Sequence, residues 1–95
     1  MKSRIYKWLL SKCLHQRKFK KAYVFGSFVY TGRLYRDVDI LLVVSAWNVA
    51  KEIEYLRTTF RHIFQMRLHI QKYHTSQVLQ LHAFLKNAYP VREIV

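Results

Sequence analysis

Apolar residues recur along the chain with two periods, one typical of helices and one typical of strands. Over residues 3–18 they stand at helical spacing among lysines and arginines, and they are Ile5, Trp8, Leu9, Cys13 and Leu14. This pattern predicts a basic amphipathic helix within the N-terminal segment 1–20. We expect its apolar stripe to pack on a sheet; the alternative is a helix that lies on a membrane surface.

Three segments have the composition of strands, and they cover residues 22–25, 38–44 and 66–72. The second (VDILLVV) is almost continuously apolar, as in a central strand that is covered on both faces. The third alternates, which predicts a strand with one polar face. Its apolar set is Met66, Leu68 and Ile70, and its polar set is Arg67, His69 and Gln71. Between the first two strands, residues 28–36 are expected to form a polar loop.

Two more helices are expected around the third strand. The earlier one follows a capping residue, Ser45 or Asn48, and its apolar face is Val49, Ile53, Leu56, Phe60 and Ile63. The later one spans about residues 76–88 and is expected to bury Leu79, Leu85, Val78 and His82. Pro90 would end it, and residues 91–95 would form a tail. This order predicts an α/β fold, a three-stranded mixed sheet with helices packed on one face.

The composition is that of one small folded domain covering residues 1–95. The hydrophobic fraction is 52%, with only 2 Gly and 1 Pro, which excludes a disordered chain. A core this small gives a modest stability margin, so we expect that a partner protein can form part of the folded assembly.

The charge is strongly positive, with 17 Lys and Arg against 5 Asp and Glu and a net charge of +12. Such a surface attracts polyanions such as RNA or DNA by counterion release; the alternative is that it only keeps the protein soluble. No acidic residue precedes Asp37, and the candidate nucleic-acid contacts are Lys2, Arg4, Lys7, Lys12, Arg17, Lys18, Lys20 and Lys21. Tyr6, Trp8, Tyr30 and Tyr35 lie among the basic residues. They either stack on bases or pack within the protein.

The number of cysteines and the lengths of the apolar runs limit the cellular compartments in which we expect the protein. A single cysteine, Cys13, allows no intramolecular disulfide and no Cys-rich zinc site. The apolar stretch 8–10 is too short for a signal peptide, and the run 40–44 is far below the ~20 residues that cross a bilayer. We therefore expect a soluble protein without a membrane span, in the cytoplasm or another reducing compartment.

Candidate chemistry is concentrated at Gly26-Ser27 and at Asp37 and Asp39. A strand that ends in Gly-Ser offers backbone N–H groups and a hydroxyl to phosphate oxygens. The two aspartates are one residue apart on a strand, so both carboxylates project from the same face. Such a pair suits a hard cation such as Mg²⁺, which takes its other ligands from water and substrate phosphates.

The stretch GSFVYTGRLYRDVDILLV resembles the signature of the minimal nucleotidyltransferases, small relatives of DNA polymerase β and of the aminoglycoside nucleotidyltransferases. The end of the chain, LHAFLKNAYPVREIV, is weakly similar to the closing helix of that family. The resemblance implies a nucleotidyltransferase-like fold that binds NTP and Mg²⁺ or Mn²⁺ and transfers NMP with release of pyrophosphate. Asp37 and Asp39 would then ligate the metal ions, and Gly26 and Ser27 would hold the β- and γ-phosphates. Arg33 and Arg36 would assist them or remain ordinary loop charges.

The chain departs from the family pattern at His69, which stands where the family carries a third carboxylate. Histidine is a poor ligand for Mg²⁺, though acceptable to Mn²⁺ or Zn²⁺, and it can act as a general base. The alternative, which we favour, is an incomplete active site with His69 as an ordinary sheet residue. Glu52, Glu54 and Glu93 are the other carboxylates, and their positions on a helix surface and in the tail make them poor replacements. A second departure is the bulky sequence that follows Gly26-Ser27, where the family often carries a small turn and an arginine.

Two functions therefore stay open. The first is an NTP-dependent transferase that acts on a macromolecule, either RNA such as tRNA or a partner protein. The second is a catalytically degenerate module that binds RNA or a ribonucleoprotein through its basic surface.

Overall fold

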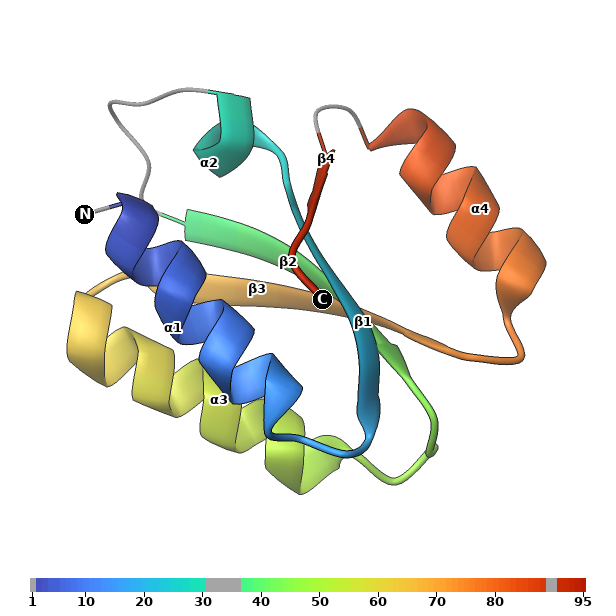
Figure 1. The fold of residues 1–95 in the computed structure, drawn as a ribbon, viewed down its shortest axis with the longest axis horizontal. Helices are drawn as coiled ribbons and strands as arrows, with labels where there is room; N and C mark the ends of the chain where they lie inside the picture. Colours follow the sequence, from blue (N-terminus) through green and yellow to red (C-terminus); the bar gives the residue numbers. More distant parts are fainter. Residues whose placement is uncertain (1, 31–36, 89–90) are drawn as a thin grey trace.

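A computed structural model describes residues 2–30, 37–88 and 91–95 of the chain. The helices are α1 (Lys2–Leu14), α2 (Ser27–Tyr30), α3 (Ala50–Phe64) and α4 (Val78–Asn87). The strands are β1 (Phe19–Phe25), β2 (Asp37–Val44), β3 (Arg67–His74) and β4 (Val91–Glu93). They form one mixed sheet in the order β3-β2-β1-β4 (Figure 1). β1 is antiparallel to β2 and β4, and β2 is parallel to β3, which requires the crossover that α3 supplies.

The expected α/β class is confirmed, but the expected number of strands is wrong. The segment expected to be a tail contains β4, whose Val91 pairs with Phe25 and whose Glu93 pairs with Tyr23. Three residues are too few to show an alternating pattern, so the sequence carries no local signal for this strand. The pairing supplies backbone hydrogen-bond partners along an edge of β1 that would otherwise be bare.

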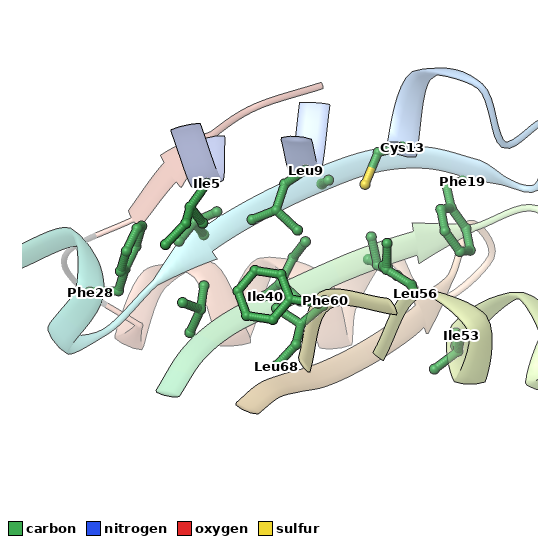
Figure 2. Packing of buried hydrophobic residues seen from close by; sticks show 14 of the residues in the cluster. Ile5, Leu9, Cys13, Phe19, Phe28, Ile40, Ile53, Leu56, Phe60 and Leu68 are labelled. Atoms are coloured by element: carbon green, nitrogen blue, oxygen red, sulfur yellow. The ribbon is translucent and has the colours of Figure 1, made fainter. Parts of the chain in front are cut away.

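One face of the sheet is covered by α1 and α3, which lie side by side on it in Figure 1. All but two of the side chains in the predicted apolar stripes of α1 and α3 are at least partly buried. The fully or almost fully buried set is Ile5, Leu9, Cys13, Val49, Ile53, Leu56 and Phe60. Figure 2 shows side chains of this set meeting Ile40 and Leu68 of the strands. The apolar side of β3 is confirmed too, with Leu68 buried and Met66 and Ile70 packed on the core.

The two exceptions lie near the ends of the helices. Ile63 is 40% exposed and Phe64 is buried in its place, because Phe64 continues the four-residue spacing from Phe60. Leu14 is 61% exposed, since α1 ends there and not at residue 18. The expected cap of α3 is also wrong. The N-cap residue is Val49, which makes no side-chain cap bond, and its side chain is fully buried in the core.

The segment after β1 differs from the expected polar loop, because its first part is helical and packs in the core. Residues 27–30 form the short helix α2, and Phe28 is fully buried in the same core. Its ring lies 5.2 Å from that of Tyr6 on α1. The later part of the expected loop, with Arg33, Tyr35 and Arg36, lies outside the described residues.

The second face of the sheet carries α4, so the helices do not all lie on one face. Phe84 contacts Phe25 and Tyr73 with ring centroids 5.0 and 5.9 Å apart. The expected burial of Val78, Leu79 and His82 is wrong: the first two are 50% and 82% exposed, and the histidine is exposed as well. At about 100° per residue, Leu79 lies about 140° around the helix from Phe84, so the contact with the sheet turns it outward. Leu85 is half-buried. The expected end of this helix at Pro90 lies outside the described residues.

No helix in the described part of the chain is long and apolar enough to cross a bilayer.

Candidate active site on the second face of the sheet

The two aspartates of β2 project from the second face of the sheet, because they alternate with the core residues Val38 and Ile40. Their side chains are each 29% exposed, so both are accessible yet partly enclosed. Residues 41 and 43 continue the same face as buried Leu41 and Val43. The face is therefore polar at the start of β2 and apolar toward its end.

Each aspartate has a basic partner directly opposite on β3. The parallel register pairs Asp37 with Arg67 and Asp39 with His69. Arg67 Nε donates to Asp37 Oδ1 at 3.0 Å, and His69 Nδ1 lies 3.3 Å from Asp39 Oδ1. His69 therefore lies opposite Asp39, on the face that the resemblance implied for it.

Gly26 lies against Asp39, at the corner where β1 ends. Phe25 pairs with Asp39 in the register, and the chain then turns at Gly26 with φ +78°, in the left-handed region that favours glycine. A Cβ at this position would lie 2.9 Å from Asp39 Oδ2, so any side chain there would have to displace the carboxylate. Ser27 follows and is exposed. The sequence motif is therefore brought together in space: the Gly-Ser corner directly adjoins the second aspartate.

The carboxylates near this corner suit a cation that takes its other ligands from substrate and water. They are too few to surround a cation with protein ligands alone. Within residues 2–30, 37–88 and 91–95, no group of three or more His, Cys, Asp and Glu could hold a metal ion. The three glutamates are engaged elsewhere: Glu52 by Lys18, Glu54 by Arg57 and Glu93 by Lys21. Two carboxylates remain, which is the number with which Mg²⁺ is often held when substrate phosphates and water complete its shell. Because Gly26 has no Cβ, its backbone can lie directly beside the Asp39 carboxylate.

A hollow of about 600 Å³ adjoins the corner, between the sheet and α4. Its lining residues are Phe25, Gly26, Tyr73, Gln80, Ala83, Phe84, Asn87 and Ala88. Aromatic rings and two side-chain amides make a lining suited to a flat heteroaromatic group. The sequence pattern did not predict this hollow. The aromatic residues next to Gly26 and near the end of β3 were its only signal in the sequence, and they are brought together by the position of α4, which the sequence did not indicate.

The candidate nucleic-acid residues are spread over α1 and β1. Lys18 and Lys21 form ion pairs with Glu52 and Glu93, which reduces the charge they offer. Lys12 lies over the rings of Trp8 and Tyr55. The remaining members are on the surface of α1 or near it, and they are Lys2, Arg4, Lys7, Arg17 and Lys20. The two other candidate phosphate contacts, Arg33 and Arg36, lie outside the described residues.

Of the candidate stacking aromatics, two pack within the protein. Trp8 makes edge contacts with Phe60 and Phe64 at 5.7 and 5.8 Å. Tyr6 lies on Phe28, and the Arg92 guanidinium stands 4.1 Å from its ring centroid. Burial raises the pKa of Tyr6 in spite of this arginine. The side chains of Tyr30 and Tyr35 are outside the described part of the structure.

Neither the models of known protein families nor the curated protein sequences match this chain.

Proposed function

We propose that this chain is a minimal nucleotidyltransferase-like protein that binds an NTP with a divalent cation and transfers NMP to a macromolecular acceptor. One observation carries the proposal: Gly26, in a conformation and a space that favour glycine alone, lies against one of two carboxylates that share a face of the sheet. The resemblance of GSFVYTGRLYRDVDILLV to the minimal nucleotidyltransferases supports the same assignment of residues.

The chemistry assigns a separate task to each part of the corner. A divalent cation, when bound, stabilises charge on the attacking and leaving oxygens. Asp37 and Asp39 hold that cation, and Gly26 and Ser27 bind the triphosphate with backbone N–H groups and a hydroxyl. A bond forms between the acceptor hydroxyl oxygen and the α-phosphorus, the bond to the β-phosphate oxygen breaks, and pyrophosphate leaves. The hollow beside Phe84 is where the nucleoside fits, since it adjoins Gly26.

His69 defines the proton path in this proposal. Its side chain is 52% exposed and lies 3.3 Å from Asp39, which supports a role beside the approaching acceptor hydroxyl. A neutral imidazole there accepts the hydroxyl proton as a general base. Arg67, which donates to Asp37, has to release that carboxylate or share it when a cation binds.

A second candidate function is supported by the same contacts. Both carboxylates already have basic partners on β3, and a protonated His69 would compete with a cation for Asp39. With a net charge of +12, the chain would then be a degenerate nucleotidyltransferase-like module that binds RNA or a ribonucleoprotein. A cation requirement separates the two functions, because binding through surface lysines and arginines needs none.

The test is transfer of label from each α-labelled NTP, with Mg²⁺ or Mn²⁺, to RNA and protein of a cell extract. We expect label in the wild-type protein and none in Asp39→Asn, which removes a charged ligand and keeps the shape. Glu93→Gln is the matched control, since it removes one carboxylate on β4 and should keep full transfer. Transfer that survives in Asp39→Asn would overturn the assigned site.

A companion variant, His69→Asp, tests the place of the histidine. It supplies a third oxygen ligand opposite Asp39 and should raise transfer with Mg²⁺ more than transfer with Mn²⁺. No cation-dependent gain would show that position 69 does not face the reacting groups.

A further inference from the structure

A second hollow, of about 560 Å³, lies at the free edge of the sheet, where α3 runs beside β3. Its lining residues are Glu54, Arg57, Thr58, Arg61, Arg67, Leu68, His69 and Ile70. At this edge the resemblance implies a role for position 69 alone, and none for the arginines. We call it the arginine hollow.

Positive charge dominates the arginine hollow. It contains three arginines from two elements, and its one carboxylate, Glu54, pairs with Arg57 at 2.9 Å. Among residues 2–30, 37–88 and 91–95, no carboxylate forms an ion pair with Arg61. The Arg57 and Arg67 side chains are 47% and 62% exposed, so they are open to a ligand. Planar guanidinium groups in such a set match the paired oxygens of phosphates.

The arginine hollow adjoins the candidate active site directly, because two of its residues belong to both. Arg67 donates to Asp37, and His69 touches Asp39. Leu68 and Ile70, between and beyond them, turn to the α3 side, so the lining of the hollow includes side chains from both sides of this strand. A ligand lying along it would have one end beside Asp39.

We propose that the arginine hollow binds backbone phosphates of a single-stranded nucleic acid, the acceptor of the proposed transfer. Only the role of this nucleic acid as the acceptor rests on the proposed function. The binding itself is inferred from the residues of the hollow alone. Arginines placed on both a helix and a neighbouring strand suit successive phosphates of one chain better than a single phosphate group. The end of a nucleic-acid strand is also the part whose hydroxyl can reach the carboxylate pair, which lies on β2 next to the edge strand β3.

The binding test uses a fluorescein-labelled single-stranded RNA of about ten nucleotides, in the size range that small single-strand binders cover. The variant is Arg57→Gln with Arg61→Gln, and the matched control is Lys51→Gln with Lys86→Gln, two exposed lysines outside the arginine hollow and outside the candidate nucleic-acid residues. Both doubles remove two exposed charges from the same net charge. We expect at least a tenfold loss of affinity in the arginine double and less than a threefold loss in the control, by fluorescence anisotropy. The salt slope should fall by roughly 0.7 for each arginine lost.

Two results would overturn the proposal. Equal losses in the two doubles would overturn it, because the RNA would then follow overall charge. RNA binding that is unchanged while metal-ATP affinity falls would also overturn it, since the hollow would serve the free triphosphate. A DNA strand of the same sequence distinguishes RNA from DNA as the source of the phosphates. Asp39→Asn separates this inference from the proposed function: it should lose transfer and keep RNA affinity, so a failure of transfer in every protein leaves the binding result decisive.

Discussion

The two faces of the sheet differ in what lies on them, although the same strands build both. On the face under α1 and α3, the core side chains are apolar and almost fully buried, as Ile40 and Phe60 show. On the other face, Asp37, Asp39 and His69 are partly or largely exposed, and α4 contacts the strands through the ring of Phe84. The first face holds the fold together, and the second leaves room for a ligand.

β2 shows how one sequence serves both purposes. In DVDILLVV, the even-numbered side chains enter the core, and the odd-numbered ones begin with two carboxylates before turning apolar. Burial of the even set stabilises the strand from one side, so the aspartates on the other side need not contribute to stability. A substitution should therefore act on stability or on ligand binding according to the face on which it lies.

The largest expected contrast concerns the chemistry of Cys13, in the core face. Burial raises the pKa of its thiol from 9.0 to about 12. At about pH 8 its thiolate fraction is therefore roughly a thousandfold lower than in the unfolded chain. We expect iodoacetamide to modify Cys13 at least that much more slowly in the native protein than in guanidinium chloride, as mass spectrometry would record. The unfolded thiol also loses its proton first, so stability should fall as the pH rises above 9.0.

Rapid modification under native conditions would mean that the core face opens readily, and the contrast between the faces would be lost.

Next in size is Phe60→Ala, which empties a fully buried site between α3 and the sheet. We expect a loss of about 3–5 kcal/mol in the free energy of unfolding, measured in urea by tryptophan fluorescence, since Trp8 contacts this ring. Tyr55→Ala on the same helix removes a 59% exposed side chain and should cost about 0.5 kcal/mol or less.

If Phe60→Ala is unfolded, Phe60→Leu gives a smaller loss in the same direction. Equal effects at positions 55 and 60 would contradict the assignment of the core.

A smaller loss of stability than that of Phe60→Ala is expected from Gly26→Ala at the corner of the second face. A left-handed φ and a Cβ 2.9 Å from Asp39 Oδ2 should together cost about 1–3 kcal/mol. The variant should also lose metal-dependent ATP binding by calorimetry, because the added methyl group displaces the Asp39 carboxylate. Ser27→Ala is the neighbouring control: it should keep the stability and weaken ATP binding alone. Normal ATP binding by the Gly26→Ala protein would remove Gly26 from the phosphate site.

The sequence was sufficient for elements with a long periodic pattern and insufficient where one contact sets the position. The core stripes of α1 and α3 and the alternation of β3 follow from spacing and are observed, whereas the place of His69 opposite Asp39 was implied by the family resemblance. β4 has three residues, and its position depends on pairing with β1. The direction of α4 depends on Phe84, whose aromatic partners Phe25 and Tyr73 belong to other elements and are not marked by any period.

The same distinction between what spacing predicts and what tertiary contacts determine applies to the candidate site. Gly26, Asp37 and Asp39 could be selected by residue type and spacing, because glycine and paired carboxylates have few other uses in that pattern. The aromatic hollow beside α4 and the arginine hollow could not, since each joins a helix to a strand from elsewhere in the chain.

The most direct test of the account is where a metal-nucleotide binds, measured by the broadening of backbone amide signals when Mn²⁺ and ATP are added together. We predict selective broadening at Gly26, Ser27, Asp39 and His69, with little at Val44 and His74, the opposite ends of β2 and β3. Asp39→Asn should remove it. Broadening that is absent, or that survives unchanged in Asp39→Asn, would contradict the claim that the second face is a nucleotide site.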